Sequence, residues 1–296
     1  MTSSTVDHKD ISAGHLVDTL FGVQEEPDRT TRHRIAAEEE LPHYLFDGHD
    51  NERQSALPLI NVAHYRPKIV SQKNIVDLIP YADELALFER RWGFVKKPEE
   101  NRESWCLRVE KEAVPVLEKL VALSQEHQLL QPRALYAYFF CAAQEDTLYL
   151  YKDNKKEVFL TIDLPRLKNG VCMADKIARK DSGAFDTIAA VGVNMGRNAT
   201  EMAKRWLSAG KEVDYRYLHG FALEMLNAMT LYTAGIIAAE ECCMGDVYGL
   251  GSAKQGAAKV QSALIKMLDA SLIDIAFSRN YLMMPEYSSL ALVFPR

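Results

Sequence analysis

The sequence predicts an α+β fold with a twisted, mostly antiparallel sheet and flanking helices, and three observations lead to it. Short runs rich in β-branched and aromatic residues gather in the middle of the chain, long amphipathic segments flank them, and the two kinds do not alternate regularly. Because parallel strands need a crossover helix after each strand, this clustering favours antiparallel neighbours. The 296 residues are 48% hydrophobic and 26% charged, which is typical of a globular protein.

Residues 1–64 differ from the remainder of the chain. They are polar and acid-rich, and they carry six of the eight histidines. No two of these histidines have the i, i+4 spacing of a helical metal site, so we expect no metal there. A segment of this composition supplies few core side chains. We therefore expect a partly flexible extension over 1–64 and a folded body over 65–296.

Five strands are predicted in the body by alternation and by polar turns between them. The second and third of these form a hairpin, because only a short polar connection separates them. We expect all five in one sheet: 133–143, 147–151, 157–164, 185–193 and 289–294.

Helical periodicity predicts four segments around one longer helix. Residues 98–128 read as an amphipathic helix with a bend at Pro115, where the backbone donor is missing. Asn198 is the expected N-cap, and Gly210 the expected end, of a second helix. The other two segments are a helix-rich unit at 75–94, closed by Gly93, and a helix at 252–270.

The longest predicted helix spans 214–241, with Asp214 as its N-cap. Gly220 lies one turn inside it, where glycine costs about 1 kcal/mol relative to alanine. We therefore expect another segment to approach the backbone closely at Gly220. The apolar side chains that share one stripe, and that should pack on the sheet, are Leu218, Phe221, Ala222, Met225, Met229, Tyr232, Ile236 and Ile237.

Composition also excludes several classes of function. A net charge of −6 argues against nucleic acid as a partner. The longest apolar stretch, 228–239, is shorter than the roughly 20 residues that span a bilayer, and the N-terminus lacks the layout of a signal peptide. We expect a cytoplasmic protein without a membrane partner.

The motifs of several common sites are missing too. The five cysteines form no CxxC pair, and we interpret them as buried thiols, with a redox role for Cys242 and Cys243 as the alternative. No Gly-rich phosphate loop, GxSxG or HExxH motif occurs. Motif chemistry alone would stop at an α+β domain with no catalytic residue.

Four segments, taken in their order along the chain, say more about function than the single motifs do. They are IPYADELALFERRWGF (79–94), LLQPRALYAYFFC (129–141), VCMADKIARKDSGAFDTIAAVGVNMG (171–196) and DYRYLHGFALEMLNAM (214–229). Together they resemble the activation domain of cobalamin-dependent methionine synthase, over about residues 65–295. The resemblance implies an α+β body that binds S-adenosylmethionine and takes part in methionine biosynthesis. It also implies two partners, a separate cobalamin-carrying methyltransferase and a flavodoxin-type electron donor. Because the chain has no cobalamin-binding Asp-x-His-x-x-Gly motif, cobalamin would be present only in trans.

The same resemblance implies a set of ligand contacts. In Tyr81-Ala82-Asp83, Asp83 matches the aspartate that holds the ligand's ammonium group, although without the resemblance Asp83 reads equally well as a helix cap or a solvated acid. The family's ligand loop, an Arg followed by Gly-Tyr-Pro-Ala-Cys-Pro, corresponds to 247–256, where only Gly251 is retained. The ligand carboxylate would then need the backbone of Gly249 to Gly251, or Lys254. Ser252, in the same loop, and Tyr287, before the last strand, complete the expected set.

Two functions remain open. The chain is either a stand-alone module that supports reductive reactivation of a separate methyltransferase, or a repurposed non-catalytic binding protein that keeps the fold and has lost S-adenosylmethionine binding. In the second case Tyr248, Leu250 and Tyr287 would fill the groove. Each lost charge-assisted hydrogen bond removes roughly 1.5–3 kcal/mol. We therefore expect weak or no binding of S-adenosylmethionine by the chain alone.

Overall fold

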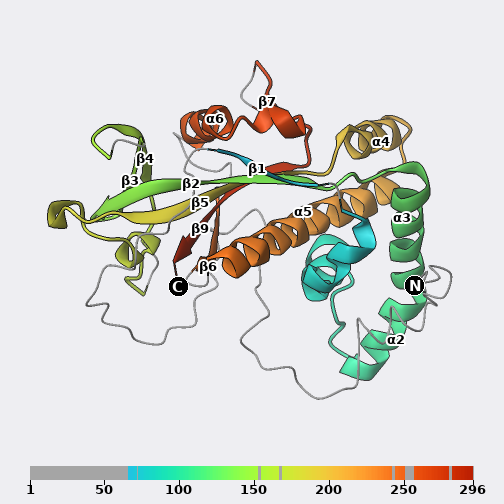
Figure 1. The fold of residues 1–296 in the computed structure, drawn as a ribbon. Coiled ribbons are helices and arrows are strands. Elements are labelled where there is room, and N and C mark those ends of the chain that lie inside the picture. Colours follow the sequence, from blue (N-terminus) through green and yellow to red (C-terminus); the bar gives the residue numbers. More distant parts are fainter. Residues whose placement is uncertain are drawn as a thin grey trace, which may run out of the picture.

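The computed structural model describes residues 66–71, 73–152, 155–166, 169–241, 244–250, 257–279 and 282–295. The predicted extension over 1–64 lies outside these residues, as do Cys242 and Cys243. Over the described part, a seven-stranded sheet has the order β4-β3-β2-β5-β9-β6, with β1 also paired to β2 (Figure 1). Its strands are β1 (Lys68–Val70), β2 (Arg133–Gln144), β3 (Thr147–Tyr151), β4 (Val158–Asp163), β5 (Asp186–Asn194), β6 (Met244–Gly249) and β9 (Ser288–Pro295).

Every strand pair in this sheet is antiparallel. The five predicted strands are all present and all in one sheet, so the α+β prediction is confirmed. Strands β1 and β6 were not predicted. The ligand loop expected from residue 247 is wrong at its start, because Val247 and Tyr248 pair with Val293 and Leu292 of β9. Both are good strand formers, and they extend an apolar edge.

Side chains alternate between the two faces of the central strands, so the core divides into two clusters. On β2, Ala134, Tyr136 and Tyr138 face one cluster, which also holds the buried stripe of α5 (Glu212–Glu240). Leu135 and Phe139 face the other, which holds the buried side of α6 (Ala257–Met267). Figure 1 shows α5 along one face of the sheet and α6 over the other.

The long helix α5 confirms the predicted central helix, with a correction at its start. It begins at Glu212 after Lys211, and Asp214 lies in its first turn rather than at the N-cap. Two acids in that turn complement the helix dipole. Leu218, Met225 and Met229 are buried in the core, as predicted. Among the described residues, α5 alone has the length and hydropathy of a membrane-spanning helix, and 61% of its apolar window is buried inside the fold.

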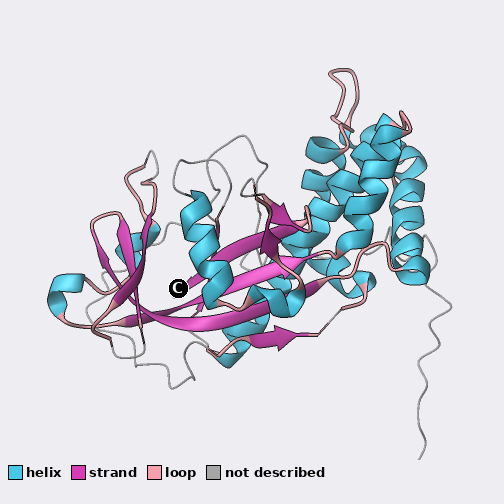
Figure 2. Ribbon diagram, turned by 90° about the horizontal axis from the view of Figure 1, so that it is seen from above, coloured by secondary structure: helices cyan, strands magenta, loops and turns pink. Residues whose placement is uncertain are grey.

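The segment predicted as one bent helix is two helices, α2 (Arg102–Glu112) and α3 (Val114–His127). Ala113 separates them. Inside one continuous helix Pro115 would leave a backbone hydrogen bond unmade, whereas in the first turn of α3 its missing donor costs nothing. In α4 (Arg197–Ser208) the N-cap is Gly196, so the prediction of Asn198 is wrong. The Asn198 amide instead donates to the Gln128 carbonyl. Figure 2 shows these helices gathered at one end of the sheet.

Short elements complete the described chain. The helix-rich unit at 75–94 contains a 3-10 helix, η1 (Ile75–Tyr81), and a π-helical segment, η2 (Ala86–Arg91). Gly93 ends this unit with a φ of 79°, a left-handed conformation that favours glycine. The others are 3-10 helices η3 (Met173–Lys176), η4 (Lys180–Ser182) and η5 (Ala270–Ile273), and a small hairpin of β7 (Ala276–Phe277) and β8 (Met283–Met284).

Candidate functional site

The start of α5 meets the 75–94 unit at very short range. A Cβ atom at Gly220 would lie 2.8 Å from the Trp92 indole and 2.9 Å from Arg91 Cβ. The Trp92 indole N–H donates to the Tyr217 carbonyl at 3.0 Å, which fixes the ring against α5. The close approach expected at Gly220 is therefore present, and the segment that makes it is η2 with the residue after it.

A charged cluster lies one turn further along this contact. Arg91 Nε donates to Glu224 Oε2 at 3.0 Å, and the Asp83 backbone N–H donates to Glu224 Oε1 at 2.8 Å. The Glu224 side chain is 2% exposed and that of Arg91 11%. Burial raises the pKa of Glu224, while Arg91 and the Asp83 N–H act in the opposite sense. Glu224 thus holds the segment that carries Asp83 in a fixed position.

Asp83 itself is a helix cap that remains partly open to solvent. Its Oδ1 accepts from the Ala86 backbone N–H at 3.0 Å, and its Oδ2 accepts from Arg90 at 3.2 Å. The Asp83 side chain is 16% exposed, and that of Arg90 is 42% exposed. Asp83 Oδ2 is therefore paired with a charge that is itself open to solvent. As a helix cap Asp83 uses Oδ1, and as a ligand contact it would use Oδ2, so the two roles are compatible.

Of the other predicted residues, the structure describes only Gly249 and Tyr287. Gly249 ends β6, is exposed, and has open space where a Cβ would lie. The Leu250 N–H already donates to the Leu290 carbonyl at 2.9 Å, so it is not available to a ligand carboxylate. Gly251, Ser252 and Lys254 lie outside the described residues. Their roles, like that of Gly249, stay predictions.

Tyr287 is fully buried beside the start of α5. Its hydroxyl oxygen lies 3.3 Å from His219 Nδ1, and Tyr215 stacks on the His219 ring. Burial raises the pKa of Tyr287. Tyr248 belongs to the α6 cluster and Tyr287 to the α5 cluster, so these two lie on opposite faces of the sheet and do not fill one groove. No hydrogen bond or ring contact joins Asp83, Gly249 and Tyr287 to one another.

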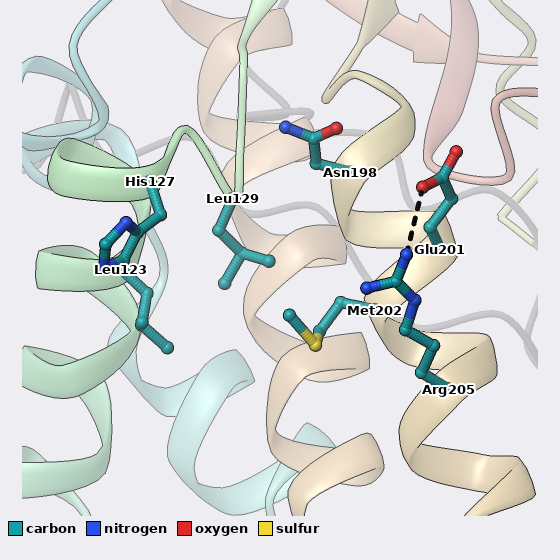
Figure 3. A pocket seen from close by; sticks show the side chains of 7 residues that line it. All are labelled: Leu123, His127, Leu129, Asn198, Glu201, Met202 and Arg205. Carbon is teal, nitrogen blue, oxygen red and sulfur yellow. Dashed lines mark ion pairs between the residues drawn. The ribbon is translucent and has the colours of Figure 1, made fainter.

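A separate hollow of about 290 Å³ lies at the helical end, between α3 and α4 (Figure 3). Leu129 and Met202 contribute apolar surface, while Glu201 and Arg205 of α4 pair with each other at 3.9 Å. Neither Asp83, Gly249 nor Tyr287 lines it. Among the described residues, no group of His, Cys, Asp and Glu could hold a metal ion.

Sequence reasoning found some of these residues and missed others. Gly220 stood out because glycine is unfavourable inside a helix, and the structure supplies the neighbour that it predicts. Arg91 and Trp92 were not singled out, because a charged residue next to an aromatic one has no spacing that signals a buried pair. The Tyr136 and Tyr138 hydroxyls, which approach the end of α5, carried no signal either, since strand residues at i and i+2 usually read as packing.

Comparisons with known proteins bear on the fold first. No family model matches the chain. A solved structure described as "Crystal Structure of the MetH Reactivation Domain bound to AdoHcy" matches with a TM-score of 0.61, covering 83% of this chain and 83% of that one at 16% identity. The fold is therefore that of the methionine synthase reactivation domain, as the resemblance in the sequence implied.

One curated protein gives a sequence match. The methionine synthase of Mycobacterium tuberculosis (strain ATCC 25618 / H37Rv) is 25% identical over 174 residues, which is 56% of this chain. The chain spans only 15% of the length of that relative. Sequence and fold thus agree on one likeness, to the activation domain of methionine synthase.

Proposed function

We propose that the chain is an activation-domain-like module that binds an S-adenosyl ligand and supports the reductive reactivation of a separate cobalamin-dependent methyltransferase in the cytoplasm. The observation that carries this proposal is the fold, which is shared over 83% of both chains with a domain described as bound to AdoHcy. The match to a methionine synthase in sequence is a second support.

The described residues fit one end of such a ligand. Asp83 Oδ2 offers a carboxylate whose present partner, Arg90, comes from a side chain that is 42% exposed. An ammonium group from the ligand would take the place of the guanidinium, a charge-for-charge exchange. The buried Glu224–Arg91 pair keeps the Asp83 backbone still during this exchange, because a well-packed pair has no second position nearby.

The other end of the ligand finds fewer donors. Leu250 N–H is engaged with β9, so a ligand carboxylate depends on residues 251–254 or on the partner protein. Each missing charge-assisted hydrogen bond weakens binding by roughly ten- to a hundredfold. Affinity in isolation is therefore expected to be weak, and docking on the cobalamin-carrying partner would strengthen it.

The contribution of this chain to the reaction is positioning. S-adenosylmethionine supplies the methyl group, and a flavodoxin-type donor supplies the electron. Held at Asp83 against the rigid start of α5, the ligand would keep a fixed orientation, and docking on the partner would exclude water from the contact. Because the ligand is already held in one orientation, less translational and rotational entropy is lost when it meets the reaction partner.

A reactivation assay in trans tests this function. The methyltransferase is a cobalamin-dependent methionine synthase without its own activation domain, in its Co(II) form, supplied with flavodoxin, reductant and S-adenosylmethionine. We expect visible absorption to show the return of methylcobalamin only when this chain is added, and a slower return with Asp83→Asn. No return with the wild-type chain would contradict the reactivation role.

The second candidate is a binding protein that keeps the fold without S-adenosylmethionine. It is favoured by two engaged groups, since Asp83 caps η2 and pairs with Arg90, and Leu250 N–H belongs to the sheet. Absence of S-adenosyl binding with and without a cobalamin-carrying partner would select this candidate over the first.

A further inference from the structure

A box of three side chains lies at the C-terminal end of α5, away from Asp83. The hydroxyls of Tyr136 and Tyr138, both on β2, donate to the two carboxylate oxygens of Glu240 at 2.8 and 2.9 Å. The two rings stand at 87° with centroids 5.8 Å apart. Two perpendicular aromatic walls and a carboxylate therefore face one point.

That point holds a cation of the chain itself. Lys68 Nζ lies 2.7 Å from Glu240 Oε2, and 5.6 and 5.5 Å from the centroids of Tyr136 and Tyr138. Both ring distances fall within the roughly 6 Å over which an aromatic face attracts a cation. The arrangement is that of an aromatic cage around an ammonium group.

The walls of the cage are fixed, whereas its occupant is not. Tyr136 and Tyr138 are buried on a central strand. Lys68 lies on β1, which is three residues long and pairs only with β2 in the described chain. The side chain of Lys68 is 44% exposed and that of Glu240 is 35% exposed. Lys68 and Glu240 are therefore the parts of the cage that solvent reaches.

The charge of the cage persists at neutral pH. Burial by itself would raise the pKa of Glu240, but the ammonium of Lys68 and the two tyrosine hydroxyls outweigh it and lower the pKa. The carboxylate is therefore ionised, and its tyrosine donors remain when Lys68 leaves. It can serve as counter-ion to another cation.

We infer that the cage of Tyr136, Tyr138 and Glu240 is a binding site for a small organic onium cation, an alkylated ammonium or a sulfonium, with Lys68 as a built-in competitor. Methylated onium ions suit this chemistry, because they are weakly hydrated and leave water for an aromatic face more readily than a primary ammonium does. This site is independent of the proposed function, which rests on Asp83 and its contact with Glu224 near the middle of α5.

Ligand-observed NMR titration of the full chain with tetramethylammonium and with trimethylsulfonium tests the inference, at constant ionic strength. Lys68→Gln removes the competing charge and changes an exposed residue. Lys180→Gln is the matched control, since Lys180 Nζ lies 3.7 Å above the single ring of Tyr149. tert-Butanol serves as a neutral probe of similar shape. Thermal unfolding of each variant shows that it folds.

We expect Lys68→Gln to bind at least one of the two cations at least about tenfold more tightly than the wild type and Lys180→Gln do. Adding Glu240→Gln to Lys68→Gln should remove that gain, and tert-butanol should show none. The inference is overturned if neither cation binds Lys68→Gln more tightly than the wild type. It is equally overturned if the tighter binding by Lys68→Gln persists after Glu240→Gln is added, or if Lys68→Gln binds tert-butanol as tightly as it binds the cations.

Discussion

Two glutamates of α5, Glu224 near its middle and Glu240 at its C-terminal end, each pair with a cation from an earlier part of the chain, in two different environments. Glu224 meets Arg91 where both side chains are almost wholly buried, and Glu240 meets Lys68 where both are about a third exposed or more. The Coulomb attraction is the same in kind. The two pairs differ in what surrounds them and in what replaces a lost partner.

The comparison separates a locking contact from an exchangeable one. A buried pair that loses one member leaves a charge without water or counter-ion, so breaking the pair that joins η2 to α5 is costly. In an exposed pair, water and salt replace a lost member, so the pair contributes little stability and can change occupant. The contact at Glu224 is thus suited to positioning, and the one at Glu240 to exchange.

Breaking the buried pair should have the largest effect. Glu224→Ala leaves Arg91 without its carboxylate and the Asp83 N–H without its acceptor, so we expect a loss of about 3–5 kcal/mol in the free energy of unfolding. Urea denaturation measures it. Glu240→Ala is the matched variant at the C-terminal end, where water can solvate Lys68 but two tyrosine hydroxyls lose their acceptor, so we expect a smaller loss of about 1–3 kcal/mol. Equal losses for the two variants would remove the distinction drawn above.

Alanine substitutions at two glycines of α5 should change stability by a smaller amount and in opposite directions. Gly220→Ala places a methyl group 2.8 Å from the buried Trp92 ring, which is held by its bond to Tyr217, so we expect a loss of about 1–3 kcal/mol. Gly235 has open space around it and an exposed position in the same helix. Gly235→Ala should therefore gain up to about 1 kcal/mol from helix propensity. Thermal and urea unfolding measure the change in unfolding free energy for each variant. A Gly220→Ala variant more stable than the wild type would refute the close contact.

The smallest effect is a dependence on pH at the exposed end. The pKa of Glu240 is lowered below its ordinary value of 4.5, so its contribution is complete above pH 4.5 and is lost as pH falls through the lowered value. The difference in unfolding free energy between wild type and Glu240→Gln should therefore shrink as the pH drops below 4.5. A difference that grows toward acid pH, in denaturation curves at several pH values, would contradict the assignment.

Much of the fold could be predicted from the sequence because its signals are local. Alternation in 133–143 and 289–294, and the 3.6-residue stripe of 214–241, depend only on neighbouring residues. The likeness of four segments in order gave the fold itself. Strand β6 was missed because its pairing with β9 is a contact between distant segments, and the Gly249 and Gly251 around it read as a loop.

The candidate site was less accessible from sequence. Asp83 was found by likeness to a motif, but the position of Arg90 and Arg91 depends on the π-helical segment, which no periodicity announces. The cage around Lys68 joins β1, β2 and the end of α5, three segments far apart in the chain. Only the folded arrangement brings such residues together.

Binding of an S-adenosyl ligand at Asp83, beside α5, is tested most directly by calorimetric titration with S-adenosylhomocysteine. The titration is run on the wild type, on Asp83→Asn and, as a control, on Asp77→Asn, which changes an exposed acid of η1. We expect a dissociation constant on the order of a millimolar for wild type and Asp77→Asn, weakened about tenfold or more by Asp83→Asn. Saturable binding that is unchanged by Asp83→Asn, or no binding to the wild type even with a cobalamin-carrying partner present, would contradict the claim.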